Sequence, residues 1–325
     1  MKKKICVISF DHWGYDHNIV ESLKEKGIES IHIKIGNFKH KNFFHKLKNS
    51  LFKIFLNKNP KNKKRQDYII DTLNNIGKQD QILVISPETI ELEYHLKIKK
   101  FTSRYIAYLC DSSDRAPVEH LLKNVFDDIY SFDQQDVVKY NLKKTTNYIP
   151  LLRELETNKK IKYQAIYIAS FDKRVQSILR ISKKLEEFKI NHLFIIVGKK
   201  VLVKQLFNFF KKNKSIIYRS NKISKEQMYS YYLESTIIFD LVRDNQTGLS
   251  FRVFEAMALQ KKLITDNITI SNYSLFNENN IYIINESNMD SISSFFSKPY
   301  EILPNNIYEE YTVNNWTNNI FNLKN

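Results

Sequence analysis

One stretch of the sequence, residues 245–267, places a polar loop, a short amphipathic helix and a strand in the order that an anion-binding site requires. Gly248 lets the backbone approach a ligand closely, and the amides after it would lie at a helix N-terminus, where unpaired N–H groups and the helix dipole attract anions. Arg252 could fork onto phosphate oxygens, and Glu255 could accept two hydrogen bonds from a ribose diol. This chemistry would hold a nucleoside diphosphate. The residues that would take part are Thr247, Gly248, Leu249, Ser250, Arg252 and Glu255.

The same spacing has a second interpretation. Arg252 and Glu255 are three residues apart, and such a pair stabilises the surface of an ordinary helix without any ligand. Short motifs of this kind also arise by chance. The motif taken alone leaves both interpretations open.

Three further polar loops each follow an apolar run that is typical of a strand. In doubly wound sheets, ligands bind beyond the carboxyl ends of the strands, so each of these loops is a candidate site. Asp111 and Asp11 are the main candidates for a general base, with His12 and His17 as imidazole alternatives. Aspartates at such positions also cap helices, and that role stays open for both. The three loops are residues 11–17, 111–115 and 170–174.

Apolar strand-like runs alternate with helical patterns along the whole chain, which predicts parallel sheets built from βαβ units. The charged, aperiodic segment 154–162 is the best candidate for a linker between two halves. We therefore predict two domains, residues 1–155 and 163–325, of which the second ends in a helix at about 308–323. In the first half, helices are expected at 16–26, 66–76 and 88–99 and strands at 5–10, 81–86, 104–109 and 128–132. In the second half, strands are expected at 165–170, 192–198, 215–218, 235–241, 262–266 and 281–284.

The composition, 42% hydrophobic and 26% charged over 325 residues, is that of a globular protein with room for two cores. Cys6 and Cys110 both lie in apolar runs without zinc-site spacing, so we expect buried thiols in a reducing compartment. No run reaches the roughly 20 apolar residues that span a bilayer, and the N-terminus lacks the pattern of a signal peptide. We expect a cytoplasmic protein.

A net charge of +16 calls for an anionic partner. Within the basic region, residues 40–58 place apolar side chains at helical spacing among lysines. This pattern is typical of a helix that lies on an anionic membrane surface, and also of a helix whose apolar stripe packs on a sheet. We see no nucleic-acid recognition motif and expect no nucleic-acid partner.

The helix of the first motif resembles the C-terminal half of GT-B glycosyltransferases. Glu-Ala-Met-Ala stands at residues 255–258, and residues 262–265 take the place of the strand that follows this motif in the family. The family commonly has a second glutamate eight positions before the first, where this chain has Thr247. Four patches are similar to a narrower group, the spore-maturation-protein-like glycosyltransferases and related enzymes of capsule and lipopolysaccharide clusters. These patches are residues 9–16, 108–112, 170–174 and 245–255.

The resemblance implies a GT-B fold, in which two doubly wound Rossmann-like domains face a cleft and a C-terminal helix packs back across it. It implies that the second domain holds the nucleotide-sugar donor, a UDP- or GDP-sugar, and that the first carries the acceptor and the base. Lys173 and Arg174 would neutralise the diphosphate leaving group in place of a metal ion, Ser170 could donate to a phosphate, and Glu255 would grip the ribose. From the residues alone, Lys173 and Arg174 could instead form a solvated first helical turn, although cations are unfavourable there without a partner.

We therefore predict a metal-independent glycosyltransferase, most simply a hexosyltransferase, that needs no cofactor besides its donor. The predicted acceptor is a bacterial surface glycan or glycolipid of the capsule, O-antigen or lipopolysaccharide core. The predicted location is the cytoplasm, with peripheral attachment to the inner face of the membrane through residues 40–58. Two alternatives remain: a nucleotide-binding protein without turnover, which Thr247 favours, and a basic nucleic-acid-binding protein.

Overall fold

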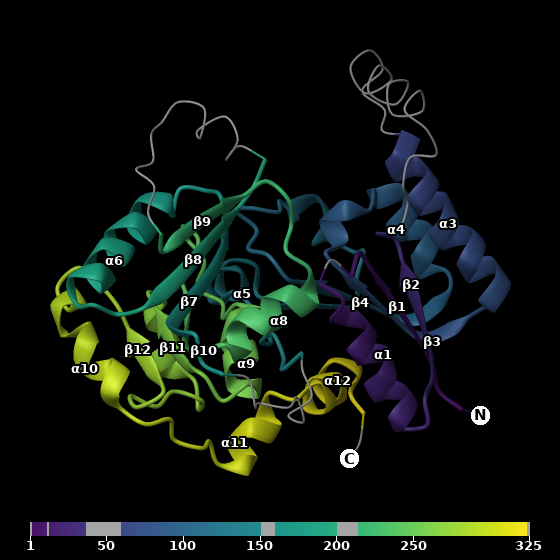
Figure 1. Ribbon diagram of the computed structural model, residues 1–325. Coiled ribbons are helices and arrows are strands. Elements are labelled where there is room, and N and C mark those ends of the chain that lie inside the picture. The colour runs from purple at the N-terminus through teal and green to yellow at the C-terminus, as the bar shows by residue number, and fades with distance from the viewer. Residues whose placement is uncertain (1, 12, 37–59, 151–159, 200–213, 324–325) are drawn as a thin grey trace. The chain divides into compact units, whose positions relative to one another are not determined.

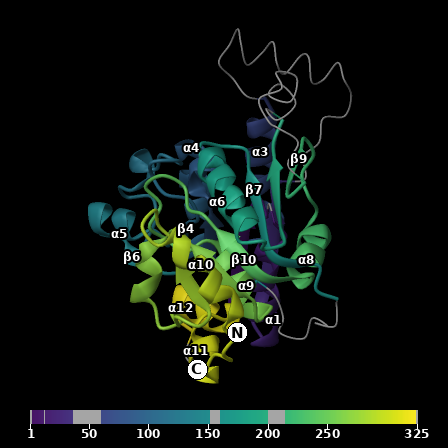
Figure 2. The ribbon, with the colours of Figure 1, turned by 60° about the vertical axis from the view of Figure 1, so that its left-hand side comes forward.

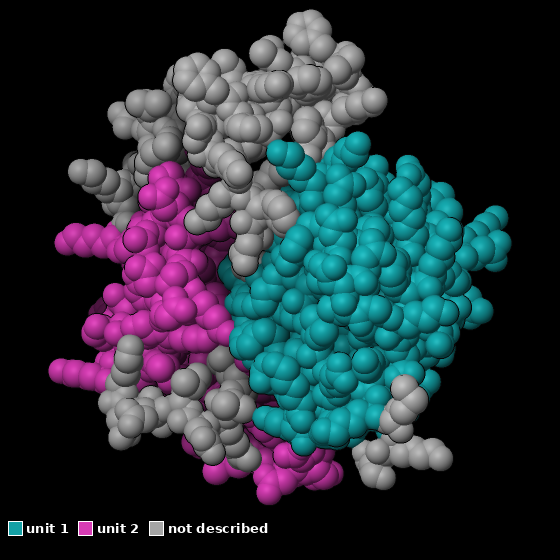
Figure 3. Space-filling model, turned by 90° about the vertical axis from the view of Figure 1, so that its right-hand side faces the viewer, with its two compact units in different colours: residues 1–146, 313–325 teal, residues 147–312 magenta. Residues whose placement is uncertain are grey.

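The structure, a computed structural model, describes residues 2–11, 13–36, 60–150, 160–199 and 214–323. The chain divides into two compact units, coloured separately in Figure 3: unit 1 comprises residues 1–146 and 313–325, and unit 2 comprises residues 147–312. Each unit is built on one six-stranded sheet whose neighbouring strands are all parallel. The prediction of two doubly wound α/β domains is confirmed.

The sheet of unit 1 has the strand order β2-β1-β3-β4-β5-β6. The later residues of its central strands β3 and β4 are apolar and buried, because helices cover both faces, α3 and α4 on one and α1 and α12 on the other (Figure 1). The strands are β1 (Lys4–Ser9), β2 (Glu29–Lys34), β3 (Gln79–Ile85), β4 (Thr102–Leu109), β5 (Asp128–Ser131) and β6 (Lys143–Lys144). The helices are α1 (Asp16–Glu25), α3 (Pro60–Ile76), α4 (Leu92–Lys99), α5 (Gln134–Tyr140) and α12 (Val313–Phe321), with 3-10 turns η1 (Pro87–Thr89) and η2 (Glu119–Leu121).

The sheet of unit 2 has the order β12-β11-β10-β7-β8-β9. One apolar cluster joins α8, α9 and α11 to one face, and a second joins α6 and α10 to the other (Figure 2). The strands are β7 (Tyr163–Ser170), β8 (His192–Val197), β9 (Ile216–Arg219), β10 (Ser235–Asp240), β11 (Lys262–Thr265) and β12 (Ile281–Ile283). The helices are α6 (Val175–Glu187), α8 (Lys225–Leu233), α9 (Phe251–Ala258), α10 (Ile292–Ser297) and α11 (Asn305–Glu310), with 3-10 turns η3 (Ile268–Asn272) and η4 (Met289–Ser291).

The strand orders give each unit one point at which the direction of winding reverses. In unit 1 the chain leaves β1 toward β2 on one side and leaves β3 toward β4 on the other, so the reversal lies between β1 and β3. In unit 2 it lies between β7 and β10. Ligands of open α/β sheets bind outside the carboxyl ends of the strands at such a switch point. Topology thus singles out the loops after β1, β3, β7 and β10.

Several sequence expectations differ from the structure. The helix expected at 88–99 begins only at Leu92, because η1 forms a separate turn after β3. The final helix expected at 308–323 is two helices, α11 and α12. The sequence pattern misses β2, which mixes polar and apolar residues, and the two-lysine edge strand β6.

Other expectations lie outside the described residues. These are His12, the basic segment 40–58 and residues 151–159, which include much of the expected linker. Among the described helices, none combines the length and apolar character needed to cross a membrane.

The last helix, α12, belongs to unit 1 and is held at both ends. At its start, Trp316 Nε1 donates to the Thr146 carbonyl at 2.9 Å, and the indole ring packs edge-on against Tyr108. At its end, Arg104 Nη1 donates to the Ile320 carbonyl at 3.0 Å. The amide of Gln81 donates to the next carbonyl, that of Phe321, at 2.9 Å. These side chains satisfy carbonyls that a helix C-terminus leaves without intrahelical partners.

Arg104 also pairs with Asp128, so replacing it tests this attachment. Arg104→Met should lower the free energy of unfolding of unit 1 by about 2–3 kcal/mol, because it exposes a helix end and removes a partner from a largely buried carboxylate. Both tryptophans of the chain, Trp13 and Trp316, lie in unit 1, so their fluorescence in a urea titration reports this loss. Arg180→Met, at an exposed ion pair of unit 2, is the control and should leave the signal unchanged. Equal stability of the Arg104 variant and the native protein would contradict the attachment.

Candidate functional site

At the switch point of unit 2, a buried ion pair fixes the start of α9. Asp240, the last residue of β10, is buried and accepts hydrogen bonds from Arg252 Nη1 and from Ser250 Oγ, the latter at 2.9 Å. Ser250 in turn caps α9, because its Oγ accepts the backbone N–H of Arg252 at 3.2 Å. Burial opposes the charge of Arg252, but Asp240 outweighs that cost and raises the pKa of the guanidinium. The loop after β10 is thereby tied to the sheet.

Arg252 therefore points inward. Its Nη2 donates to the carbonyl of Ile168 in β7 at 3.1 Å, and the guanidinium lies over the Tyr167 ring, 5.4 Å from the centroid. Only 20% of the side chain is exposed. In this arrangement the first role of Arg252 is to bridge β7 and β10, and the predicted phosphate contact stays a prediction.

A second arginine closes the same switch point from the loop after β7. Arg174 binds Asp172 in a bidentate manner, with Nε–Oδ1 at 2.9 Å and Nη2–Oδ2 at 2.5 Å. Its Nη1 donates to the carbonyl of Leu241, the residue after β10, at 2.6 Å. Burial works against the charged carboxylate, but the bonds from Arg174 lower the pKa of Asp172. Arg174, 11% exposed, thus joins the two loops at the point that topology singles out.

The loop before α9 is pinned from both sides. Thr269 Oγ1 donates to the carbonyl of Thr247 at 2.6 Å, and Asn267 Nδ2 reaches the carbonyl of Gly248 at 3.3 Å. From the other side, Asn147 Nδ2 donates to the carbonyl of Leu249 at 2.9 Å. Gly248 does not adopt a positive φ; the left-handed position of this loop is Asn245, with φ of 61°. The turn expected at the glycine is therefore made three residues earlier.

The predicted donor-binding residues thus separate into two groups. Arg174, Ser250 and Arg252 lie in the buried network, and Glu255 is buried beside Arg252 and Tyr232. In the exposed group, Lys173 is 90% exposed and its amino group lies 3.4 Å from the exposed Asp244, while Ser170 ends β7 at the surface. Sequence reasoning missed Asp172 and Asp240, the two carboxylates that organise the network.

In unit 1, two predicted bases have different surroundings. Asp11 follows β1 with a left-handed φ of 47°. Its carboxylate accepts the backbone N–H of Asp16 at 3.0 Å and pairs with Lys34 at 2.9 Å. Burial works against its charge, yet these partners lower the pKa of Asp11, which weakens it as a base. Asp111 is 38% exposed and pairs with Arg115 at 2.7 Å.

The strongest base candidate by environment is Glu88, which sequence reasoning assigned to a helix. Burial raises the pKa of Glu88 to about 7, and burial raises that of Asp16 to about 6. Glu88, Asp16 and Asp111 all lie near the Cys110 thiol, since each adds to the rise of its pKa after the larger effect of burial. Residues that follow β1, β3 and β4 therefore place three carboxyl groups within electrostatic reach of one thiol.

The turn that carries Glu88 is rigid. Ser86 is left-handed, with φ of 58°, and its carbonyl accepts both the N–H and the Oγ1 of Thr89, at 3.2 and 2.7 Å. His95, fully buried, bonds through Nε2 to the Pro87 carbonyl at 2.9 Å and through Nδ1 to the Tyr105 hydroxyl at 2.7 Å. Burial lowers the pKa of His95 to about 4, so the neutral ring donates to Pro87 and accepts from Tyr105. The strained left-handed backbone of Ser86 is stable only because the surrounding contacts hold it in place.

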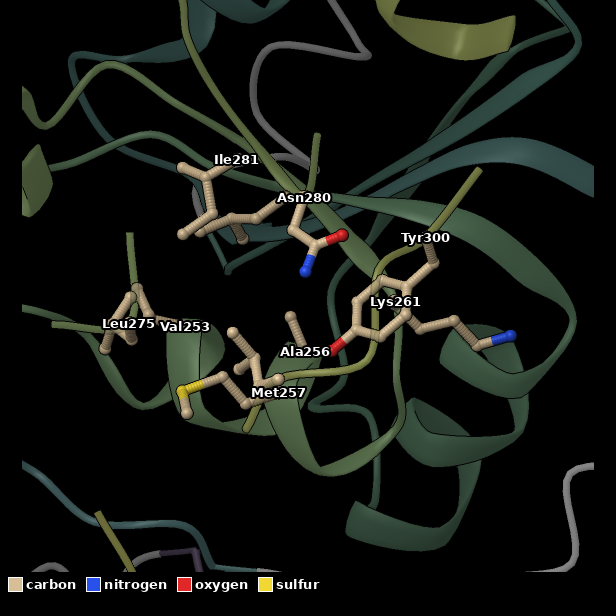
Figure 4. A pocket seen from close by; sticks show the side chains of 10 residues that line it. Val253, Ala256, Met257, Lys261, Leu275, Asn280, Ile281 and Tyr300 are labelled. Atoms are coloured by element: carbon tan, nitrogen blue, oxygen red, sulfur yellow. The ribbon is translucent and has the colours of Figure 1, made fainter. Parts of the chain in front are cut away.

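One small cavity lies elsewhere in unit 2, between α9 and the starts of β11 and β12 (Figure 4). Its volume of about 20 Å³ is room for a single water molecule, and Met257, Leu263 and Ile281 line it. It lies at the end of the sheet opposite the switch point, so it is a packing gap. Within the described ranges, no three His, Cys, Asp or Glu side chains converge in a way that could hold a metal ion.

The raised pKa of Glu88 makes stability depend on pH. Between about pH 4.5 and 7 the folded chain keeps a proton that the unfolded chain releases, so this carboxyl destabilises unit 1 increasingly as pH rises through that window. Glu88→Gln should therefore match the native protein at pH 4 and exceed its unfolding free energy at pH 8 by about 1–2 kcal/mol, after allowance for solvent screening. Tryptophan fluorescence in urea titrations at pH 4 and pH 8 measures the two unfolding free energies. Glu93→Gln, at an exposed side chain, is the control. A difference that does not vary with pH would contradict this environment.

Comparisons with known proteins identify the fold. No protein-family model and no curated protein matches the sequence. Solved structures do match over nearly the whole chain. An alpha-glucosyltransferase in complex with UDP and a 13-mer DNA superposes with a TM-score of 0.60 at 11% identity, covering 98% of this chain and 94% of that one.

Two further matches have the same extent. A UDP-forming α,α-trehalose-phosphate synthase from Burkholderia xenovorans gives a TM-score of 0.61 at 12% identity, covering 99% and 98% of the two chains. A UDP-GlcNAc 2-epimerase from Neisseria meningitidis bound to UDP-GlcNAc gives 0.54 at 11% identity, covering 98% of both. At these identities the likeness concerns the fold: the chain has the GT-B fold, with two Rossmann-like domains.

Proposed function

We propose that this protein is a glycosyltransferase that moves a sugar from a nucleotide-sugar donor to a bacterial surface glycan. The observation that carries the proposal is the coincidence of the predicted donor loops with the switch point of unit 2, in a fold shared end to end with proteins whose structures contain UDP or a UDP-sugar. The resemblance of four sequence patches to capsule and lipopolysaccharide enzymes supports the acceptor class.

The donor is assigned to unit 2. We infer that the rigid network of Asp172, Arg174, Asp240 and Arg252 holds two loops in place, and that Lys173 and the first amides of α9 receive the diphosphate. A network that is already paired costs little reorganisation when charge develops on the leaving group. Glu255 would receive the ribose diol. The sequence favours transfer without a metal ion, because positively charged side chains would neutralise the diphosphate instead.

The acceptor is assigned to unit 1. A general base has to take the proton of the acceptor hydroxyl as that oxygen bonds to the anomeric carbon and the nucleoside diphosphate leaves. A carboxylate whose pKa is near 7 suits that task better than one held ionised by an ion pair. We therefore place Glu88 first for this role, with Asp16 and Asp111 beside it, and leave Asp11 a positioning role through its bond to the start of α1.

A ligand screen tests the proposal as a whole. UDP, GDP and CMP should be compared by thermal unfolding, and the nucleotide that binds should then be offered as its sugar conjugates with glycan acceptors. Binding at a hundred times Kd adds about 2.7 kcal/mol to stability, a readily measured shift. Transfer to a glycan supports the proposal. Nucleotide binding without transfer would mean a regulatory binding protein, epimerisation of the free donor a different enzyme, and no shift with any nucleotide would overturn the donor assignment.

Substitutions of Lys173 and Arg174 distinguish a residue that contacts the ligand from one that positions the loops. Lys173→Met should raise the Kd of the nucleotide severalfold and leave unfolding unchanged, because its side chain is exposed. Arg174→Met should also lower the unfolding free energy by about 2–4 kcal/mol, because it leaves Asp172 without its bidentate partner. Calorimetric titration and urea unfolding give the two readouts, and Arg180→Met on α6 is the matched control. Identical behaviour of the Lys173 and Arg174 variants would refute the division of roles.

Peripheral membrane attachment is proposed from the sequence pattern of residues 40–58. Each lysine near an anionic surface contributes about 1 kcal/mol, so removing four should release the protein from anionic vesicles. Turnover of a soluble acceptor should persist. Cosedimentation that is as strong after the change as before it would reject the attachment. The lysines to replace with glutamine are Lys41, Lys46, Lys48 and Lys53.

A further inference from the structure

At the carboxyl edge of unit 1, two buried polar groups have no hydrogen-bond partner in the described part of the chain. Among the described residues, the buried side-chain atoms without a hydrogen bond include Arg65 Nε and Gln66 Nε2, both on α3. Unpaired buried polar groups are rare because each costs about 1–3 kcal/mol, more when it is charged. Two on consecutive residues call for an explanation.

Both residues lie at the switch point. The Arg65 guanidinium stacks on the ring of Phe10, the residue after β1, with its carbon 4.9 Å from the centroid. Gln66 is 2% exposed, and its Oε1 accepts the N–H of Glu91, which closes the turn after β3, at 2.5 Å. The backbone of Gly36 packs closely against Phe10, since a Cβ there would come within 2.4 Å of the Phe10 carbonyl oxygen. Residues 65 and 66 thus contact the loops after β1 and β3, the two strands between which the winding reverses.

Arg65 has no counter-ion among the residues that the structure describes. Its side-chain hydrogen bond is one long contact from Nη1 to Asn62 at 3.4 Å, and in the described part of the chain no carboxylate forms an ion pair with it. Stacking on Phe10 covers one face of the guanidinium but uses none of its N–H donors. Burial lowers the pKa of Arg65, with no opposing contribution from a nearby carboxylate. The other two arginines of unit 1, Arg104 and Arg115, each have an acidic partner.

We propose that Arg65 and Gln66 form an anion-binding site at the switch point of unit 1, which receives a phosphate or carboxylate group of the acceptor. A planar guanidinium matches both groups, and a buried amide donor adds selectivity for an acceptor oxygen. That the bound anion belongs to a glycan acceptor rests on the proposed function. The anion site itself rests on the two unpaired donors. It narrows the substrate to an acidic sugar or a sugar phosphate.

The test uses inorganic phosphate as the probe and tryptophan fluorescence, which reports unit 1, as the readout of thermal unfolding. Phosphate should raise the unfolding temperature of the native protein. Arg65→Met should weaken phosphate binding at least about tenfold, the loss expected for a charged hydrogen bond. Gln66→Glu keeps the bond to Glu91 but replaces the free donor with an acidic oxygen, and should also abolish the phosphate effect. Lys24→Met, at an exposed pair of the same unit, should bind phosphate as the native protein does.

Stability without phosphate separates a binding role from a structural one. If the role of Arg65 is to bind an anion, Arg65→Met should be at least as stable as the native protein in phosphate-free buffer, because the substitution removes an uncompensated charge. A clear loss of stability, or phosphate binding that is unchanged in Arg65→Met, would overturn the inference. Glucose 6-phosphate and glucuronate, compared with glucose, then distinguish a phosphate from a carboxylate.

Failure of the two proposals gives different results. Phosphate binding that depends on Arg65, without any sugar transfer, would support the anion site and reject the proposed glycosyltransferase activity. Transfer to neutral acceptors with no effect of Arg65→Met would do the reverse.

Discussion

The ion pair between Asp240 and Arg252 is the interaction on which the proposed donor site depends. A carboxylate that is 1% exposed at the end of a central strand would be costly by itself, and the guanidinium offsets that cost while reaching across to β7. Ser250 connects the pair to the helix by bonding Asp240 and capping α9 at once. Arg174 repeats the arrangement from the neighbouring loop. The result is a pre-formed edge in which side chains and backbone carbonyls from three segments share one network.

Unit 1 holds the loops at its switch point in place through different contacts. Its loops are fixed by a neutral histidine, His95, and by left-handed residues at the ends of β1 and β3, and burial raises the pKa of the nearby Asp16 and Glu88. Near its switch point, unit 2 therefore holds ionised arginine–aspartate pairs, whereas unit 1 places Glu88 and Asp16, two carboxyl groups with raised pKa values, near the ionised Asp11. This contrast fits a division of labour in which one unit stabilises a leaving anion and the other exchanges a proton.

The sequence predicted the parallel sheets because buried strands are long apolar runs, and each such run from Ile5 to Ile284 lies in or overlaps a strand. The motif around Arg252 and Glu255 was placed on the correct helix. Its chemistry was harder to predict, because Asp240, the partner of Arg252, lies twelve residues earlier at the end of β10 and meets Arg252 only in the folded chain. Glu88 was hidden for a similar reason: Ser-Pro-Glu reads as a helix start, and the contact from His95 that makes it a rigid turn appears only in three dimensions.

Hydrogen exchange of the backbone amides with and without the nucleotide that binds gives the most direct test of the central claim, that the switch point of unit 2 receives a nucleoside diphosphate. Bound nucleotide should slow exchange at residues 170–175 and 245–252 and change it little at the starts of β7 and β10, because the ligand covers loops that the arginine network already holds in place. Unchanged exchange in both loops, or protection confined to the opposite end of the sheet, would contradict it.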